Sequence, residues 1–259
     1  MKKYNVLEII YPIGLYYLVS GFVFFALNIL IGEAQEIYMV KQLISSGATI
    51  PFLLSLWKQD SYVEKVVYGN QKIELGRLMQ QISLTMISVG ALGVALNNFI
   101  AMTPLVKASL GFQTANENFF AGGILLEILA SCVVVPIAEE LLFRGIVLKR
   151  ASMLTGETMG ILCSALLFGV IHMNLVQFIY ATLLGFVLAA IVVKTRRVSL
   201  AVVGHASANL IAVLRAETGV LDFSYQADVP GLCFSCAMVI VGGLAAWLLF
   251  KQSAKGKQA

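Results

Sequence analysis

Charged residues are scarce in this chain: Asp, Glu, Lys and Arg make up 12% of its 259 residues, and apolar residues make up 59%. So few charges cannot cover the surface of a water-soluble protein of this length. The longest polar interval is no larger than a loop, which argues against a separate soluble domain. We therefore expect an all-α protein, a polytopic bundle of transmembrane helices that forms a single membrane-embedded domain over residues 1–259.

Metal-binding and redox residues are also few, with two histidines and four cysteines. The cysteines all lie in apolar stretches, and the pair Cys233 and Cys236 lacks a second pair at zinc-finger spacing, so packing is their expected role. The H-E-x-x-H motif of zinc proteases is missing. A small excess of basic residues is explained by anionic lipid headgroups, so no nucleic-acid partner is expected.

Apolar stretches long enough to cross the hydrocarbon core as helices occur about eight times. They cover residues 7–31, 37–57, 76–104, 118–142, 159–173, 175–193, 200–214 and 230–250. The fifth and seventh stretches are short for a full crossing. We therefore expect these two helices to pack inside the bundle or to border a watery cavity.

Basic residues predict the orientation, because short cytoplasmic loops retain an excess of them. With eight crossings and the N-terminus inside, only Lys41, Lys107 and Arg215 of the 18 basic residues fall on the outer side. We expect a multi-pass protein of a cell membrane with both termini in the cytoplasm. The short basic loops favour a bacterial plasma membrane.

Ionisable and amide side chains inside the apolar stretches gather in three short motifs, within a motif-bearing core of about residues 118–215. The motifs are Glu139-Glu140-Leu-Leu-Phe-Arg144, Phe168-Gly-Val-Ile-His172 and His205-Ala-Ser-Ala-Asn209. An ionisable group in a membrane costs about 3 kcal/mol, so such groups mark function or pair with one another. Residues four apart share a helix face, which pairs Glu140 with Arg144, whereas Glu139 is turned about 100° away toward the expected cavity.

These residue types predict hydrolysis of an amide bond at membrane depth. A carboxylate and an imidazole that converge on a water molecule can take its proton, and this is the expected role of Glu139 and His172. A second imidazole beside an amide can donate to the negative oxygen that forms when water attacks a carbonyl. That role is expected of His205 and Asn209.

The three motifs, in this order on separate helices, resemble the CPBP family. This family unites the type II CAAX prenyl endopeptidases with bacteriocin-processing and self-immunity proteins, often called the Abi family. The resemblance implies an eight-helix intramembrane endopeptidase. Its implied site is catalytic Glu139, Glu140, His172, His205 and Asn209, supported by Arg144 and Phe168.

The family has been interpreted both as metal-dependent and as glutamate-dependent. A divalent metal such as zinc would have Glu139, His172 and His205 as its candidate ligands, whereas the favoured glutamate mechanism requires no cofactor. The expected substrate is a membrane-associated peptide or protein within the lipid bilayer. Two alternatives stay open: a non-proteolytic membrane interaction or bacteriocin-immunity protein on the same fold, and a transporter whose Glu and His carry protons.

Overall fold

The computed structural model describes residues 4–68 and 74–255, and all regular secondary structure in these residues is helical. Lys2, Lys3, Lys72 and Lys257, which contribute to the charge count, lie outside the described residues. Within the described residues, six helices are long and apolar enough to cross a membrane. They are α1 (Val6–Ile31), α2 (Tyr38–Tyr68), α3 (Leu75–Ala101), α10 (Leu175–Thr195), α11 (Val198–Thr218) and α12 (Val229–Lys255). The prediction of an all-α polytopic bundle is confirmed.

The count of crossings differs from the eight expected. The fourth apolar stretch begins at the end of α5 (Leu110–Phe119) and continues into one long helix, 124–155. The two helices meet at 109°, and this bent pair makes a seventh candidate span. The fifth stretch is α9 (Glu157–Val170), which has only 14 residues. At 1.5 Å per residue α9 is about 21 Å long, shorter than the hydrocarbon core.

The long helix 124–155 is built from five segments. These are α6 (Ile124–Glu127), a π-helical segment η2 (Ile128–Val134), α7 (Val135–Glu140), a second π-helical segment η3 (Leu141–Val147) and α8 (Leu148–Thr155). The helix was expected to end near residue 142. It continues instead to Thr155, so Arg150 lies within the helix and not in a loop.

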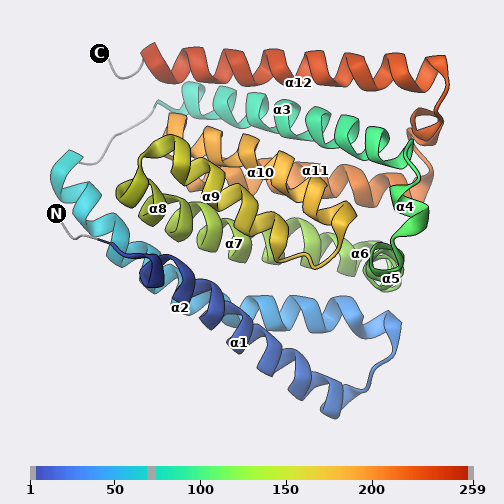
Figure 1. Ribbon diagram of the computed structural model, residues 1–259, viewed down its shortest axis with the longest axis horizontal. Helices are drawn as coiled ribbons and strands as arrows, with labels where there is room; N and C mark the ends of the chain where they lie inside the picture. The colour runs from blue at the N-terminus through green and yellow to red at the C-terminus, as the bar shows by residue number, and fades with distance from the viewer. Residues whose placement is uncertain (1–3, 69–73, 256–259) are drawn as a thin grey trace.

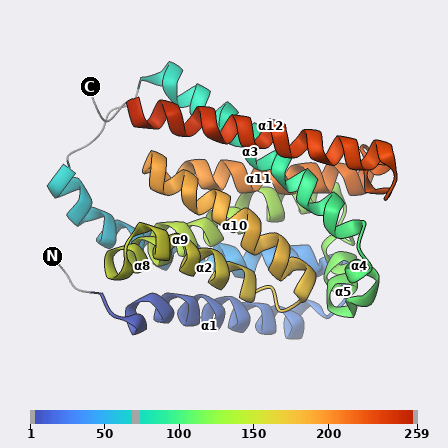
Figure 2. The same ribbon diagram turned by 45° about the horizontal axis from the view of Figure 1, so that its top comes forward.

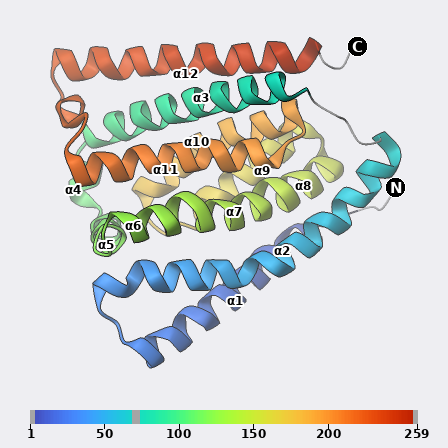
Figure 3. The ribbon, with the colours of Figure 1, turned by 180° about the vertical axis from the view of Figure 1, so that it is seen from behind.

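The helices pack in layers, with the long helix 124–155 near the centre. Figure 1 shows α12 along α3 on one side and the α1–α2 pair on the other, with α9, α10 and α11 between them. Figure 2 shows α1 on the face opposite α12, and in Figure 3 helix α7 lies between α11 and α2. Helix α1 begins and α12 ends at the same end of the bundle.

Short elements connect these helices at the other end of the bundle. They are the 3₁₀ turns η1 (Gln35–Ile37) and η4 (Asp222–Tyr225) and the single-turn helix α4 (Leu105–Ala108). Local sequence explains where α1 begins and ends. Asn5 and Glu8 form a reciprocal capping box at its start, and Gly32 follows its last turn with a φ of 89°, a conformation that glycine adopts without strain.

A buried ion pair joins α1, α2 and α8. Arg150 donates to Asp60 at 2.7 Å through Nε and also binds the carbonyl oxygen of Glu8. The Tyr4 hydroxyl donates to Asp60 at 3.1 Å. Burial, together with the Asp60 charge, raises the pKa of Tyr4 to about 12, so its hydroxyl keeps the proton that it donates. The three helices are thus tied together near the end where α1 begins.

Candidate active site

Helix α7 carries the two adjacent glutamates, and Pro136 shapes the helix before them. In η2 the backbone bond closes five residues back, from Val135 N–H to Ala130 O. The next bond of this series would run from residue 136 to Ser131, but proline has no N–H. The buried carbonyl of Ser131 is therefore free, and the Asn209 amide donates to it at 2.7 Å. Asn209 thereby joins α11 to the helix that carries Glu139.

Glu140 is fully buried and binds two cationic or polar partners through one oxygen. Its Oε1 accepts from Arg144 at 3.0 Å and lies 2.9 Å from Nδ1 of His205. The Glu140 and Arg144 side chains have no exposed surface. Because neither charge reaches water, each requires the other, and Glu140 also fixes the imidazole of His205 in place.

Arg144 has two further contacts that hold it inside the bundle. It donates to the carbonyl oxygen of Gly185 at 3.3 Å, and its guanidinium lies 4.2 Å from the centre of the Phe168 ring. A Cβ atom on residue 185 would lie 3.0 Å from Arg144 Nη2 and 3.3 Å from Phe168. A side chain at position 185 would therefore require Arg144 or Phe168 to shift by a few tenths of an ångström.

The ring of Phe168 packs against the imidazole rings of both histidines. It makes edge-to-face contacts with His172 at 5.1 Å and with His205 at 5.7 Å, measured between ring centres. His172 lies just after α9, and its Nδ1 is 2.8 Å from the carbonyl oxygen of Phe168. Since a carbonyl only accepts, Nδ1 must carry the hydrogen. In neutral His172, Nε2 is therefore an acceptor.

Glu139 points away from Glu140, as its position on the helix predicts. Its side chain is 14% exposed, and its Oε2 lies 3.9 Å from Nε2 of His205. It also interacts electrostatically with His172. The structure thus brings Glu139, His172 and His205 together around the Phe168 ring. Asn209, one turn after His205 on α11, is turned toward Ser131.

Two tyrosines of α1 that the sequence analysis did not single out lie close to this group. Tyr16 and Tyr17 both interact electrostatically with Glu139. The Tyr16 ring is buried and contacts the Tyr17 ring edge to face at 5.2 Å. Their position in the middle of an apolar stretch could have indicated a role for them, because a tyrosine hydroxyl in lipid needs a polar partner. The Tyr16 hydroxyl hydrogen-bonds to Ser46 of α2. The sequence could not indicate that Glu139 of the fourth stretch lies near α1.

Comparison with known proteins places the three motifs in one family. Residues 121–211 match the family described as type II CAAX prenyl endopeptidase Rce1-like. The match includes Glu139, His172, His205 and Asn209. This motif-bearing segment is similar to the type II CAAX prenyl endopeptidases of the CPBP family.

A protein of Bacillus subtilis (strain 168) named "Putative membrane peptidase YdiL" is 28% identical over 119 residues. The aligned segment is 46% of this chain and 46% of that protein, so the similarity spans about half of each. No solved structure matches the chain significantly.

The donor atoms of this candidate site do not converge as a metal-binding set in this geometry. Among the side chains that the structure describes, in residues 4–61 and 74–253, no three of His, Cys, Asp or Glu are spaced to hold a metal ion. One nitrogen of each histidine is already turned to an oxygen, Nδ1 of His172 to Phe168 and Nδ1 of His205 to Glu140.

Proposed function

We propose that this chain is an intramembrane endopeptidase that hydrolyses a peptide bond in a membrane-associated peptide or protein. The observation that carries the proposal is the position of Glu139, a partly exposed carboxylate beside two imidazoles in an otherwise apolar bundle. The similarity of residues 121–211 to the CAAX endopeptidase family supports the same activity.

In the proposed reaction, Glu139 and the free Nε2 of His172 hold a water molecule and take its proton. The resulting hydroxide forms a bond to the carbonyl carbon of the scissile peptide. The C–N bond then breaks as the proton passes to the amide nitrogen, which leaves as an amine, and the carbonyl carbon becomes a carboxyl group. A positioned acid–base pair of this kind contributes roughly 100- to 10,000-fold to the rate.

His205 and Asn209 are proposed to donate to the negative oxygen of the tetrahedral intermediate. Nδ1 of His205 faces the Glu140 carboxylate at 2.9 Å, and Nε2 can donate when both ring nitrogens carry a hydrogen. Asn209 uses one amide hydrogen for Ser131 and has a second available. Glu140 then acts as a positioning residue for His205, and Arg144 holds Glu140.

The test is cleavage of candidate membrane peptides by the purified chain in detergent. We expect Glu139→Gln to lower the cleavage rate at least roughly 100-fold while the thermal unfolding midpoint stays close to that of the wild type. Glu157→Gln is the matched control, because Glu157 is 54% exposed and pairs with Arg196 on the surface. Cleavage by Glu139→Gln at the wild-type rate would overturn the proposed chemistry.

If folded wild-type protein cleaves none of the peptides and both variants give the wild-type cellular phenotype, a membrane interaction or bacteriocin-immunity role replaces the protease. A pH-dependent uptake of solute into vesicles would instead favour a proton-coupled transporter.

We also propose that the end of the bundle where α1 begins and α12 ends faces the cytoplasm of a bacterial cell. The shared position of these two helix ends supports this, together with the distribution of basic residues in the sequence. Reporter fusions before residue 1 and after residue 259 are expected to report the cytoplasmic side in both cases. A signal from the opposite side at either end would contradict the orientation.

A further inference from the structure

A cavity of about 220 Å³ lies at the turn between α1 and α2. Its lining includes Phe24 and Asn28 of α1, Glu33 in the connecting loop, Tyr38 and Lys41 of α2, and Asn118 of α5. No residue of the proposed catalytic group lines it. The cavity is therefore a separate feature, at the opposite end of α1 from the Asp60–Arg150 ion pair.

Lys41 is the central feature of this cavity because its side chain is buried and its contacts within the described residues are to uncharged groups. The residue is 2% exposed. Its ammonium donates to Asn28 Oδ1 at 2.7 Å and to the carbonyl oxygen of Gly32 at 3.2 Å, and it lies 5.1 Å from the centre of the Phe24 ring. These partners are all uncharged. In the part of the chain that the structure describes, no carboxylate forms an ion pair with Lys41.

An ammonium group has three N–H donors, and two of the three are used. Burying a charge without an opposite charge is costly, so the third donor and the uncompensated charge together favour an anionic ligand. Gly32 has a φ of 89°, and in this conformation its carbonyl oxygen accepts a hydrogen bond from the Lys41 ammonium. An anion with strong acceptor oxygens, such as a phosphate group, satisfies the third donor.

The cavity also contains one negative charge, at its rim. Glu33 is exposed and lines the cavity without pairing with Lys41. A simple anion would be repelled by this carboxylate, whereas a ligand with a phosphate and a nearby amine would be attracted by both groups. A phosphate beside a primary amine is the arrangement found in phosphoethanolamine.

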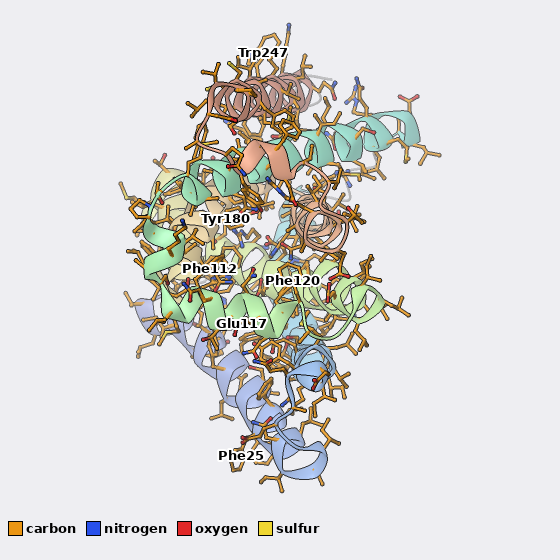
Figure 4. The ribbon with its side chains drawn as sticks, turned by 90° about the vertical axis from the view of Figure 1, so that its right-hand side faces the viewer. Phe25, Phe112, Glu117, Phe120, Tyr180 and Trp247 are labelled. Atoms are coloured by element: carbon orange, nitrogen blue, oxygen red, sulfur yellow. The ribbon has the colours of Figure 1, made fainter. Side chains whose placement is uncertain are left out.

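The surface next to the cavity favours a lipid as the source of this headgroup. Phe25, Ile29 and Leu30 are 63%, 70% and 76% exposed on the last turns of α1. Figure 4 shows Phe25 on the outside of the α1–α2 pair, away from the rest of the bundle. Such exposed apolar side chains face acyl chains in a membrane. A headgroup in the cavity would thus have its acyl chains along these side chains.

We propose that this cavity is a binding site for a phosphatidylethanolamine-type lipid, with the phosphate on Lys41 and the primary ammonium on Glu33. Asn118 at the end of α5 lines the same cavity, so the bound headgroup bridges α5 and the α1–α2 turn. The lipid site does not depend on the protease activity and is tested without it.

The experiment is native mass spectrometry of the purified full chain in detergent with dioleoyl phosphatidylethanolamine, phosphatidylglycerol or phosphatidylcholine added. Wild type is expected to retain phosphatidylethanolamine roughly tenfold better than the other two, the size of one charge-assisted hydrogen bond. Lys41→Gln is expected to lose this retention. Lys107→Gln, which changes an exposed lysine, is the matched control and is expected to behave as wild type.

Glu33→Gln tests the amine contact separately. This exposed position is not part of the packing, so the variant is expected to fold and to bind phosphatidylethanolamine no better than phosphatidylglycerol. It therefore decides the proposal if Lys41→Gln does not fold. Equal retention of all three lipids by wild type, or unchanged selectivity in Glu33→Gln, would overturn the site. If equimolar soluble O-phosphoethanolamine displaced the lipid completely, the ligand of the cavity would be the soluble headgroup compound and not the lipid.

Discussion

The side-chain amide of Asn209 donates a 2.7 Å hydrogen bond to the backbone carbonyl of Ser131. This contact exists because Pro136, five residues after Ser131, has no N–H to offer in the π-helical turn. Asn209 therefore has a structural role in addition to the proposed donation to the oxyanion. The two roles can be separated by experiment.

The first prediction uses Pro136 to separate them. Asn209→Ala leaves the buried Ser131 carbonyl without a partner, and we expect it to lower the free energy of unfolding by about 1–3 kcal/mol. In the Pro136→Ala, Asn209→Ala double variant, the new N–H of residue 136 can bind that carbonyl, so stability should be partly restored. Unfolding in detergent measures this. Additive effects of the two changes would contradict the explanation of the contact.

Activity of the same double variant gives the second prediction. If Asn209 also donates to the oxyanion, cleavage should stay impaired after stability is recovered, because alanine has no amide. The comparison is the cleavage rate of each variant at a temperature where all are folded. Recovery of full activity in the double variant would leave Asn209 with its structural role only.

The third prediction concerns the Glu140–Arg144 ion pair. Arg144→Met removes one partner of a fully buried pair, and we expect a loss of about 3–5 kcal/mol because Glu140 is left as an uncompensated charge. Arg196→Met is the control. The Arg196–Glu157 pair is 49% and 54% exposed, and a surface pair contributes about 0–1 kcal/mol. Similar losses in both variants would show that burial of the Arg144 pair has no special effect.

The fourth prediction tests the close approach of α10 to Arg144. Gly185→Ala introduces a methyl group about 3 Å from the guanidinium, and we expect a loss of about 1–3 kcal/mol from overpacking together with reduced cleavage. Gly243→Ala on α12 is the control, because nothing lies within 4 Å of the added carbon. Alanine there should be neutral or stabilising, since it is a better helix former. Wild-type stability of Gly185→Ala would contradict the packing argument.

The fifth prediction concerns metal dependence. The proposed water activation uses the Glu139 carboxylate and the His172 imidazole, so dialysis against a chelator should leave the cleavage rate within about twofold of the untreated protein, a difference below 0.5 kcal/mol in the barrier. Loss of activity that zinc restores would instead assign Glu139, His172 and His205 to a metal ion.

Much of this protein could be predicted from local patterns. The scarcity of charge predicts a membrane bundle, and the four-residue spacing of Glu140 and Arg144 predicts their ion pair, because helix geometry alone brings i and i+4 together. The opposite direction of Glu139 follows from the same geometry. The length of the fourth helix could not be predicted, because Arg150 lies beyond the apolar stretch and looks like a loop residue in the sequence, while tertiary partners bury it.

The sequence by itself therefore determined that the protein lies in a membrane, that it is helical, and which residue types form its site. These properties depend on composition and on spacing within one helix. Only the tertiary structure decided which atoms meet across helices. It placed Phe168 beside both histidines, the Asn209 amide on the Ser131 carbonyl, and the Lys41 ammonium in a cavity against Asn28 and Gly32. Such contacts join segments far apart in the chain, and they depend on how helix faces turn toward one another, which no local pattern encodes.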